Sequence, residues 1–295
     1  MRDYSELSDF LRSRRAALTP EEIGLPQLAE RRRVQGLRRE EVALAAGVSL
    51  THYTRLEQGR AQHVSDAVLD AIARTLRLTP DEHIHLMDLA RPEHAAPRRP
   101  QSPRPACADH GLRQLIDTFT DTPALILDHR NDVLAWNPMG HLLLAMHMDF
   151  DAPAVASRRP NLTRMLFLDE HVRDLYPHWH DEAQLAVASL RLVAGRHRHD
   201  RQLAELIGDL MINSEEFADR WARHPVRTCV AGVKELHHPL AGPMTLSFQS
   251  LLVPTDGGQR MIAYSAQAGS TSEAALRLLA ATLHVTRTDT PATTD

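Results

Sequence analysis

The sequence predicts two domains: an N-terminal all-α domain of five short helices, and a C-terminal α+β domain whose antiparallel sheet carries helices over one face. Three observations indicate this. Apolar residues recur at helical spacing up to about residue 90, a proline-rich stretch follows, and short β-type runs then stand at both ends of a helical middle. The chain of 295 residues is long enough for two domains.

Composition sets the predicted domain boundaries. Residues 1–91 form the first domain. The prolines of residues 92–105 mark a linker, because proline removes a hydrogen-bond donor and favours extended chain. Residues 106–285 form the second domain, and residues 286–295 are predicted to be a disordered tail.

Two short helices joined by a tight turn lie at the centre of the first domain. Leu37–Ala46 has apolar residues at helical spacing. Gly47 follows at the turn, where a residue without a Cβ adopts a left-handed conformation without steric cost. Ser49 then caps a second helix, because its hydroxyl accepts a hydrogen bond from an unpaired N–H group, and Gly59 ends that helix.

The outward face of the second helix carries side chains that can reach bases or phosphates. A helix-turn-helix inserts the start of its second helix into the major groove, where each base pair shows a distinct pattern of donors and acceptors. A plain helical hairpin is the alternative, but the glycine turn with its serine cap favours the DNA-binding form. The nearby run Arg31–Arg33 is a further candidate for phosphate contact. The predicted DNA-contacting residues are Arg38, Arg39, Ser49, Leu50, Thr51, His52, Arg55 and Arg60.

The segment Gly36–Arg60, GLRREEVALAAGVSLTHYTRLEQGR, resembles the Cro/C1-type (XRE) helix-turn-helix family. The resemblance implies double-stranded DNA as partner, a homodimer and an inverted-repeat operator. It places Ser49, Leu50, Thr51 and Arg55 where that family reads bases, and Arg39 where the family usually has a glutamine that holds a phosphate. Leu50 is apolar, so we expect it to contact a group such as a thymine methyl.

The second domain begins and ends with short β-type segments. The predicted strands cover residues 123–128, 133–137, 228–235, 244–252 and 260–266. Helical spacing covers residues 111–119, 181–194, 203–211 and 272–283, with a further helix around Phe217 and Trp221. Strands at both ends can close into one antiparallel sheet.

This order is similar to a PAS domain and, more closely, to the MmyB-like regulators, which join a Cro/C1-type head to a PAS-like ligand-binding domain. The motifs that carry the resemblance are LDHRNDVLAWNP (127–138), NLTRMLFLD (161–169), FADRWARHPVR (217–227), HHPLAGPMTLSF (237–248) and YSAQAGS (264–270). The resemblance implies a small apolar, fatty-acid-like ligand. Aromatic residues of these elements are the candidate pocket wall, although such residues more often form core: Trp136, Phe167, Trp221, Phe248 and Tyr264.

No other chemistry is predicted. The chain has 18 His, but the pairs at 178/180, 197/199 and 237/238 lack the spacing of four that brings two ligands to one helix face. We therefore expect no metal site and no cofactor. Motifs for nucleophilic, metal-dependent or nucleotide-dependent catalysis do not occur, which argues against an enzyme. The two Cys, far apart in sequence, predict neither a disulfide framework nor a zinc cluster.

The predicted function is that of a transcription regulator that binds specific DNA and senses a small apolar molecule. The alternative is a DNA-binding module whose second domain binds a protein partner. The net charge is −4, with a slight basic excess only in residues 1–105, which suits the N-terminal part of the chain to a polyanion. Neither a long apolar run nor a signal sequence is visible, so we expect no membrane insertion and a cytoplasmic, nucleoid-associated protein.

Overall fold

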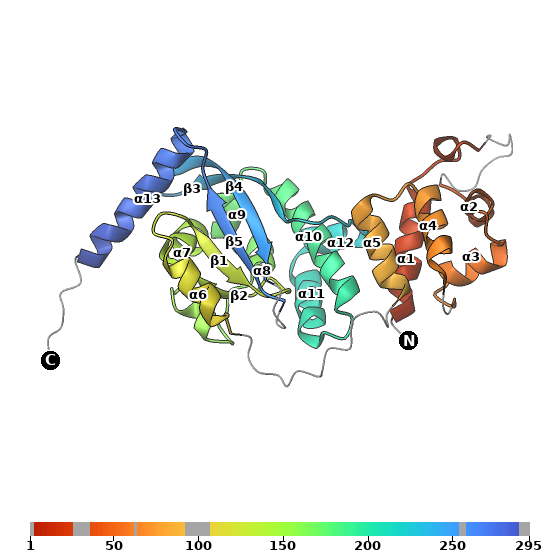
Figure 1. Cartoon of the computed structure of the whole chain (residues 1–295), viewed down its shortest axis with the longest axis horizontal. Coiled ribbons are helices and arrows are strands. Elements are labelled where there is room, and N and C mark those ends of the chain that lie inside the picture. The colour runs from red at the N-terminus through yellow and green to blue at the C-terminus, as the bar shows by residue number, and fades with distance from the viewer. Residues whose placement is uncertain (1–2, 26–35, 62–63, 92–106, 254–257, 289–295) are drawn as a thin grey trace. The chain divides into compact units, whose positions relative to one another are not determined.

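The computed structural model describes residues 3–25, 36–61, 64–91, 107–253 and 258–288 (Figure 1). Its residues form two compact units. The reader unit comprises the described part of residues 1–100 together with residues 187–205 and 219–228. The sheet unit comprises the described part of residues 101–186 together with residues 206–218 and 229–295. Arg31–Arg33 and the linker residues 92–105 lie outside the described residues.

Helices α1 to α5 of the reader unit are the five predicted helices. They are α1 (Asp3–Ala16), α2 (Arg39–Ala46), α3 (Leu50–Glu57), α4 (Asp66–Thr75) and α5 (Pro80–Ala90), with a short 3-10 helix, η1 (Glu21–Ile23). They enclose one core, in which Leu11, Leu37, Tyr53, Ile72 and Leu86 are fully buried. The apolar spacing predicted the buried faces of α1 to α4 correctly. For α5 the spacing of Ile84, Met87 and Ala90 predicted the wrong face, because Ile84 is 46% exposed while Leu86 and Leu89 are buried.

The start of α5 shows how local sequence fixes a helix boundary. The Thr79 hydroxyl accepts a hydrogen bond from the Glu82 N–H at 3.3 Å. The Glu82 carboxylate accepts one from the Thr79 N–H at 2.8 Å. Pro80 occupies the first helical position, where its missing N–H costs nothing. This capping box fixes the start of α5.

Two segments from the second half of the sequence also belong to the reader unit. They are the last part of α10 (Trp179–Arg196) and the end of α12 (Glu215–Ala222) with the residues that follow each helix. Arg196 Nε donates to Asp88 Oδ2 at 2.9 Å, and the Thr228 N–H donates to Asp81 Oδ2 at 2.8 Å. The sequence prediction assigned both segments to the second domain, because periodicity gives the buried face of a helix but not its packing partner.

The sheet unit contains the five-stranded antiparallel sheet that the sequence predicts (Figure 1). The strands lie in the order β2-β1-β5-β4-β3. Their bounds are β1 (Ala124–Leu127), β2 (Val133–Trp136), β3 (Ala231–His238), β4 (Gly242–Leu252) and β5 (Arg260–Ser265). Phe248 of β4 pairs with Tyr264 of β5, so two predicted ligand-site residues are direct cross-strand neighbours.

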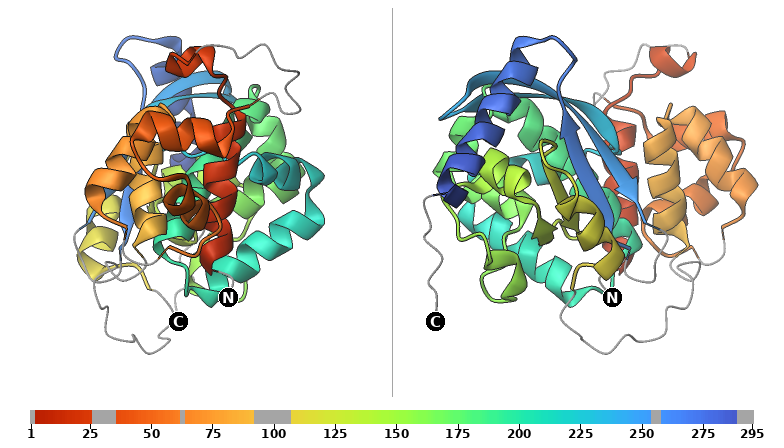
Figure 2. Two further views of the ribbon diagram at one scale, coloured as in Figure 1. Left: turned by 90° about the vertical axis from the view of Figure 1, so that its right-hand side faces the viewer. Right: turned by 60° about the vertical axis from the view of Figure 1, so that its left-hand side comes forward.

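Helices lie on both faces of the sheet rather than on one. Alternate strand residues such as Leu125 and Trp136 pack in a cluster with α7 (Pro138–Ala145), α9 (Glu170–Leu175) and α13 (Thr271–Thr288), of which α13 is the blue helix in Figure 2. The opposite face of β1 and β2 packs against Ile116 of α6 (His110–Asp117). The prediction of one covered face needs this correction, because both short strands are buried on both sides.

Asn137 explains how the β2–α7 junction is built. Its side chain is fully buried and caps α7, accepting from the Gly140 N–H at 2.8 Å. The same oxygen accepts from the Ala124 N–H at 2.9 Å, and the amide donates to the Thr122 and Phe119 carbonyls. Gly140 lets α7 approach β1, because a Cβ there would clash with the Ala124 carbonyl oxygen.

The remaining helices are η3 (Ala152–Ala154), α8 (Leu162–Leu168) and α11 (Arg201–Asn213). Helix α13 continues to Thr288, into the segment predicted to be a tail. None of the helices in the described ranges is both long and apolar enough to cross a membrane.

Candidate functional site

The turn between α2 and α3 has the geometry of a helix-turn-helix. Gly47 has a φ of 68°, and its N–H ends α2 by donating to the carbonyls of that helix. The Ser49 hydroxyl accepts from the His52 N–H at 3.1 Å and so caps α3. Val48 packs against the reader core between them. The turn and the cap are therefore formed by the residues that the sequence indicated.

The outward face of α3 and its N-terminal end carry most of the predicted DNA-contacting residues. Ser49, Thr51 and Arg55 are exposed, and Leu50 keeps 48% of its surface exposed. His52 is half-buried. Tyr53 and Leu56 point the other way, into the core. The structure thus brings together one exposed surface of short polar side chains, a leucine and an arginine, which is the composition that reads base edges.

A buried carboxylate lies directly behind this surface. The Glu57 side chain is 0% exposed and contacts two arginines from different helices. Arg15 of α1 donates through Nε and Nη2 at 2.9 and 3.0 Å, and Arg39 of α2 donates through Nε at 2.9 Å. Arg15 also donates to the Leu37 carbonyl at 2.6 Å. Glu57 therefore ties α1, α2 and α3 together.

Glu57 was not among the predicted site residues. Its only sequence signal is an acidic residue at the end of a helix that otherwise has its polar residues outside. Burial by itself would raise the pKa of Glu57, but the hydrogen bonds and charges of Arg15 and Arg39 outweigh burial and lower it. The carboxylate therefore stays ionised and keeps both guanidinium groups in place.

The pairing with Glu57 fixes the position of Arg39. Its side chain is 41% exposed, although its Nε is bound to Glu57. A guanidinium has further N–H groups on its two Nη atoms, so Arg39 can be anchored on one side and offer donors on the other. Arg38, the N-cap residue of α2, is half-buried, and Arg60 is exposed just beyond α3.

Three of the predicted ligand-site residues lie together in the sheet unit. Trp136, Phe248 and Tyr264, called here the aromatic cluster, each expose only 4% of their surface and share one apolar core. The Trp136 indole Nε1 donates to the Phe150 carbonyl at 2.8 Å. The rings of Phe248 and Tyr264 are 6.4 Å apart.

The other two predicted ligand-site residues lie elsewhere. Phe167 packs edge-on against Phe217 and Trp179, at 5.1 and 5.5 Å between ring centroids. Trp221 belongs to the reader unit, where the Arg191 guanidinium lies 3.9 Å from its ring centroid. The five aromatic residues therefore do not share one environment.

Polar groups border the aromatic cluster at one end. Lys234 of β3 lies 5.1 Å above the Phe248 ring and forms an ion pair with Glu182 of α10. Both side chains are largely buried. Burial also raises the pKa of Tyr176 and of Tyr264, so both hydroxyl groups are neutral hydrogen-bonding groups. Lys234 is the only lysine in an arginine-rich chain, but from the sequence alone this indicates a bias of composition, so it did not mark Lys234 as a site residue.

Two family models match the chain, one in its N-terminal part and one in its C-terminal part. The helix-turn-helix domain matches residues 6–86. The MmyB-like transcription regulator ligand binding domain matches residues 108–279, more than half of the chain. No curated protein matches the sequence.

Proposed function

The chain belongs to the MmyB-like transcription regulators, and we propose that it binds an inverted-repeat operator as a homodimer and senses a fatty-acid-like molecule. It is a ligand-responsive regulator with a helix-turn-helix, so operator DNA and a small ligand are its two partners. The finer proposal concerns the chemistry of the ligand and its effect on DNA. The protein acts by binding, without a catalytic step.

The proposal for DNA reading depends on the exposed face of α3. Thr51 and Arg55 are free to reach base edges, and Leu50 offers an apolar contact of the kind a thymine methyl accepts. Arg39 and Arg60 stand at the margins of this face, where phosphates are expected. Arg39 is held by Glu57, so its phosphate contact requires little ordering on binding.

The proposal for an amphipathic ligand depends on the aromatic cluster and its polar end. Trp136, Phe248 and Tyr264 offer an apolar environment to an acyl tail, which gains about 0.8 kcal/mol for each CH₂ group buried. Lys234, with Tyr264, offers a cation and a hydroxyl to a carboxylate head. The single observation that supports this chemistry best is the position of Lys234 over the Phe248 ring.

In the proposed mechanism, the ligand binds one conformation of the protein more tightly than another. Helices α10 and α12 each contribute residues to both compact units, so the chain itself links the ligand-binding half to the reader. A ligand that prefers one arrangement of these helices changes the population of the arrangement that binds DNA. A tenfold change in operator occupancy needs about 1.4 kcal/mol of preference.

A protein partner in place of the ligand is less well supported. Such a partner would need an apolar surface, and the outward residues of β4 include Thr245, Ser247 and Gln249, which are polar and exposed. Leu246 and Phe248 of the same strand are buried, whereas Leu251 and Leu252 at its C-terminal end are 52% and 73% exposed. The middle of this strand therefore favours solvent over a docked protein.

The proposal is tested by native mass spectrometry followed by titration. Freshly purified full-length protein is expected to be a dimer and to carry an amphipathic small molecule. Decanoic acid and decanol then separate head from tail: Lys234→Met is expected to weaken the acid about tenfold and leave the alcohol unchanged, because one charge-assisted hydrogen bond is lost. His237→Gln on the same strand is the control, since His237 is exposed. If Lys234→Met weakened the binding of decanoic acid and of decanol equally, Lys234 would not bind the carboxylate head.

A further inference from the structure

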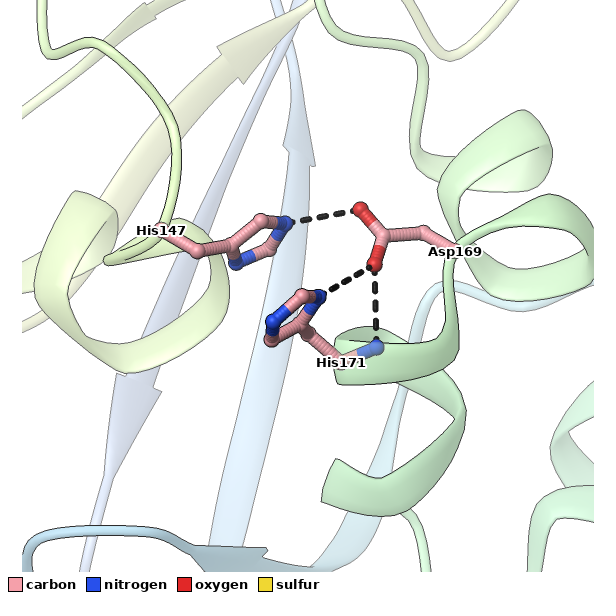
Figure 3. A group of neighbouring side chains, drawn as sticks. All are labelled: His147, Asp169 and His171. Carbon is pink, nitrogen blue, oxygen red and sulfur yellow. Dashed lines mark hydrogen bonds and ion pairs between the residues drawn. The ribbon is translucent and has the colours of Figure 1, made fainter.

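Two histidines and an aspartate meet in the sheet unit, at a place that the proposed function does not use (Figure 3). His147 follows the C-terminal end of α7. Asp169 is the residue between α8 and α9, and His171 lies in the first turn of α9. The three side chains thus come from two separate parts of the chain and converge on one point.

The geometry of this cluster is that of side chains arranged around a shared centre. His147 Nε2 lies 2.7 Å from Asp169 Oδ2, and His171 Nδ1 lies 3.3 Å from Asp169 Oδ1. The two imidazole rings are stacked, 4.5 Å apart and 11° from parallel. One potential ligand atom from each residue lies within 4.8 Å of the other two.

The backbone explains why a spacing of two works here. Asp169 has a φ of −114° and a ψ of 115°, so it precedes the helix rather than belonging to it. Its side chain folds back over the first turn, where Oδ1 accepts from the His171 N–H at 3.0 Å. The rule that ligands on a helix stand four apart applies only within a helix. A capping residue can share a site with the second residue of the helix that it caps.

We propose that His147, Asp169 and His171 bind one divalent transition-metal ion, with zinc as the expected metal. Two imidazole nitrogens and one carboxylate oxygen are ligands that Zn²⁺ prefers, and three protein ligands leave a fourth tetrahedral position for water. The metal ion would take the place of the imidazole protons that form the hydrogen bonds from His147 and His171 to Asp169. Asp169 Oδ1 keeps its capping contact while Oδ2 coordinates, so the fold of α9 does not have to change.

Burial and exposure in the cluster suit an exchangeable ion. The Asp169 side chain is 18% exposed and the His147 side chain 23%, so two ligands are held by their surroundings. The His171 side chain is 73% exposed and can rotate to complete or release the site. A bound ion would join the end of α7 to the start of α9, beside Leu144 and Val172 of the core that holds the aromatic cluster.

The test uses full-length protein treated with a chelator and then titrated with zinc chloride. Calorimetry is expected to show one saturable site per chain, and thermal unfolding should move to a higher Tm with zinc. Cobalt chloride is expected to give the visible absorption of a tetrahedral ion. His147→Gln and Asp169→Asn should each weaken zinc binding at least about tenfold, since even outer-shell changes cost that much. Asparagine keeps the helix cap, so Asp169→Asn separates coordination from folding.

His237→Gln serves as the matched control, because it removes an exposed histidine of the same unit and should leave the site intact. The proposal is overturned if zinc binds no tighter than to this chain's scattered histidines, or if the two cluster variants bind it as the parent does. It is also overturned if Asp169→Asn lowers the Tm equally with and without zinc, which is the behaviour of a purely hydrogen-bonded cluster. These outcomes are independent of whether a fatty acid binds.

Discussion

Glu57 shows how the proposed DNA-reading surface depends on a residue that is fully buried. Its buried carboxylate is bound by Arg15 from one helix and Arg39 from another. Leaving a buried carboxylate without partners is costly, so the pairs are maintained whenever the domain is folded. The position of the Arg39 guanidinium, proposed to hold a phosphate, is a consequence of this core contact.

We predict that Glu57→Gln lowers the free energy of unfolding by about 1.5–3 kcal/mol, the range for hydrogen bonds to charged groups. Because the pKa of Glu57 is lowered in the fold, the stabilisation is complete above the ordinary glutamate pKa and is lost as pH falls through the folded value. Urea unfolding followed at neutral and at acidic pH measures this. Glu40→Gln, at an exposed position of α2, is the control. Equal stability of the Glu57→Gln variant and the parent at neutral pH would contradict the prediction.

The base-reading role that we propose for Arg55 predicts a loss of specificity rather than of all binding. Arg55→Ala should cost about 1–3 kcal/mol on the selected operator and relax the preference at one position of each half-site. Arg39→Ala should weaken every sequence alike and flatten the dependence of affinity on salt. Operator selection and anisotropy titrations at several salt concentrations separate the two effects. Parent-like binding by both variants would mean that α3 does not read the groove in this orientation.

At the scale of elements, α5 carries a histidine whose pKa is lowered by burial and by the surrounding charges, so that it stays neutral. His85 is 2% exposed and packs edge-on against Phe10 of α1. Gly195 of α10 lies against the same ring, since a Cβ there would stand 2.8 Å from it. Burial first, and then the charges of Arg191, Arg198, Arg14 and His224, lower the pKa of His85 to about 3.

The depressed pKa of His85 predicts a pH-dependent reader unit. The unfolded chain takes up the proton near pH 6.5 and the folded chain near pH 3, so stability is full above pH 6.5 and falls between the two values. At pH 5 the loss from this residue alone is about 2 kcal/mol. His85→Leu should make the decline shallower by that amount, with His110→Gln as an exposed control. If the free energy of unfolding fell by the same amount between pH 7 and 4 in the His85→Leu variant and in the parent, His85 would not be the source of the pH dependence.

The elements also show where prediction from sequence ends. Periodicity, caps and glycine turns are local, so they predicted α1 to α5, the five strands and the outward face of α3. Contacts between distant residues have no local signature. The second covered face under α6, the position of Trp221 in the reader unit and the partners of Glu57 each depend on packing. The cluster at Asp169 was missed because a spacing rule for helix interiors does not apply at a cap.

At the scale of the whole molecule, one reader helix covers only a few base pairs, so specific binding is expected to require two. We predict a homodimer on an inverted repeat whose half-site centres lie about one helical turn, ~10 bp, or a multiple of it apart. Analytical ultracentrifugation at micromolar concentration and footprinting on the selected operator measure this. A monomer that protects a single half-site would contradict the prediction.

We propose that a ligand in the sheet unit changes the affinity of the reader unit for its operator. The most direct measurement is an anisotropy titration of the full-length protein on its selected operator, with and without saturating decanoic acid. The same titration is repeated with decanol in place of the acid, and with the Lys234→Met variant in place of the parent protein. The operator Kd is expected to change about tenfold with the acid, which corresponds to about 1.4 kcal/mol. The change with decanol, and the change of the Lys234→Met variant with the acid, are expected to be clearly smaller. An operator Kd that is the same with and without the acid, at concentrations where the acid is shown to bind, would contradict the claim.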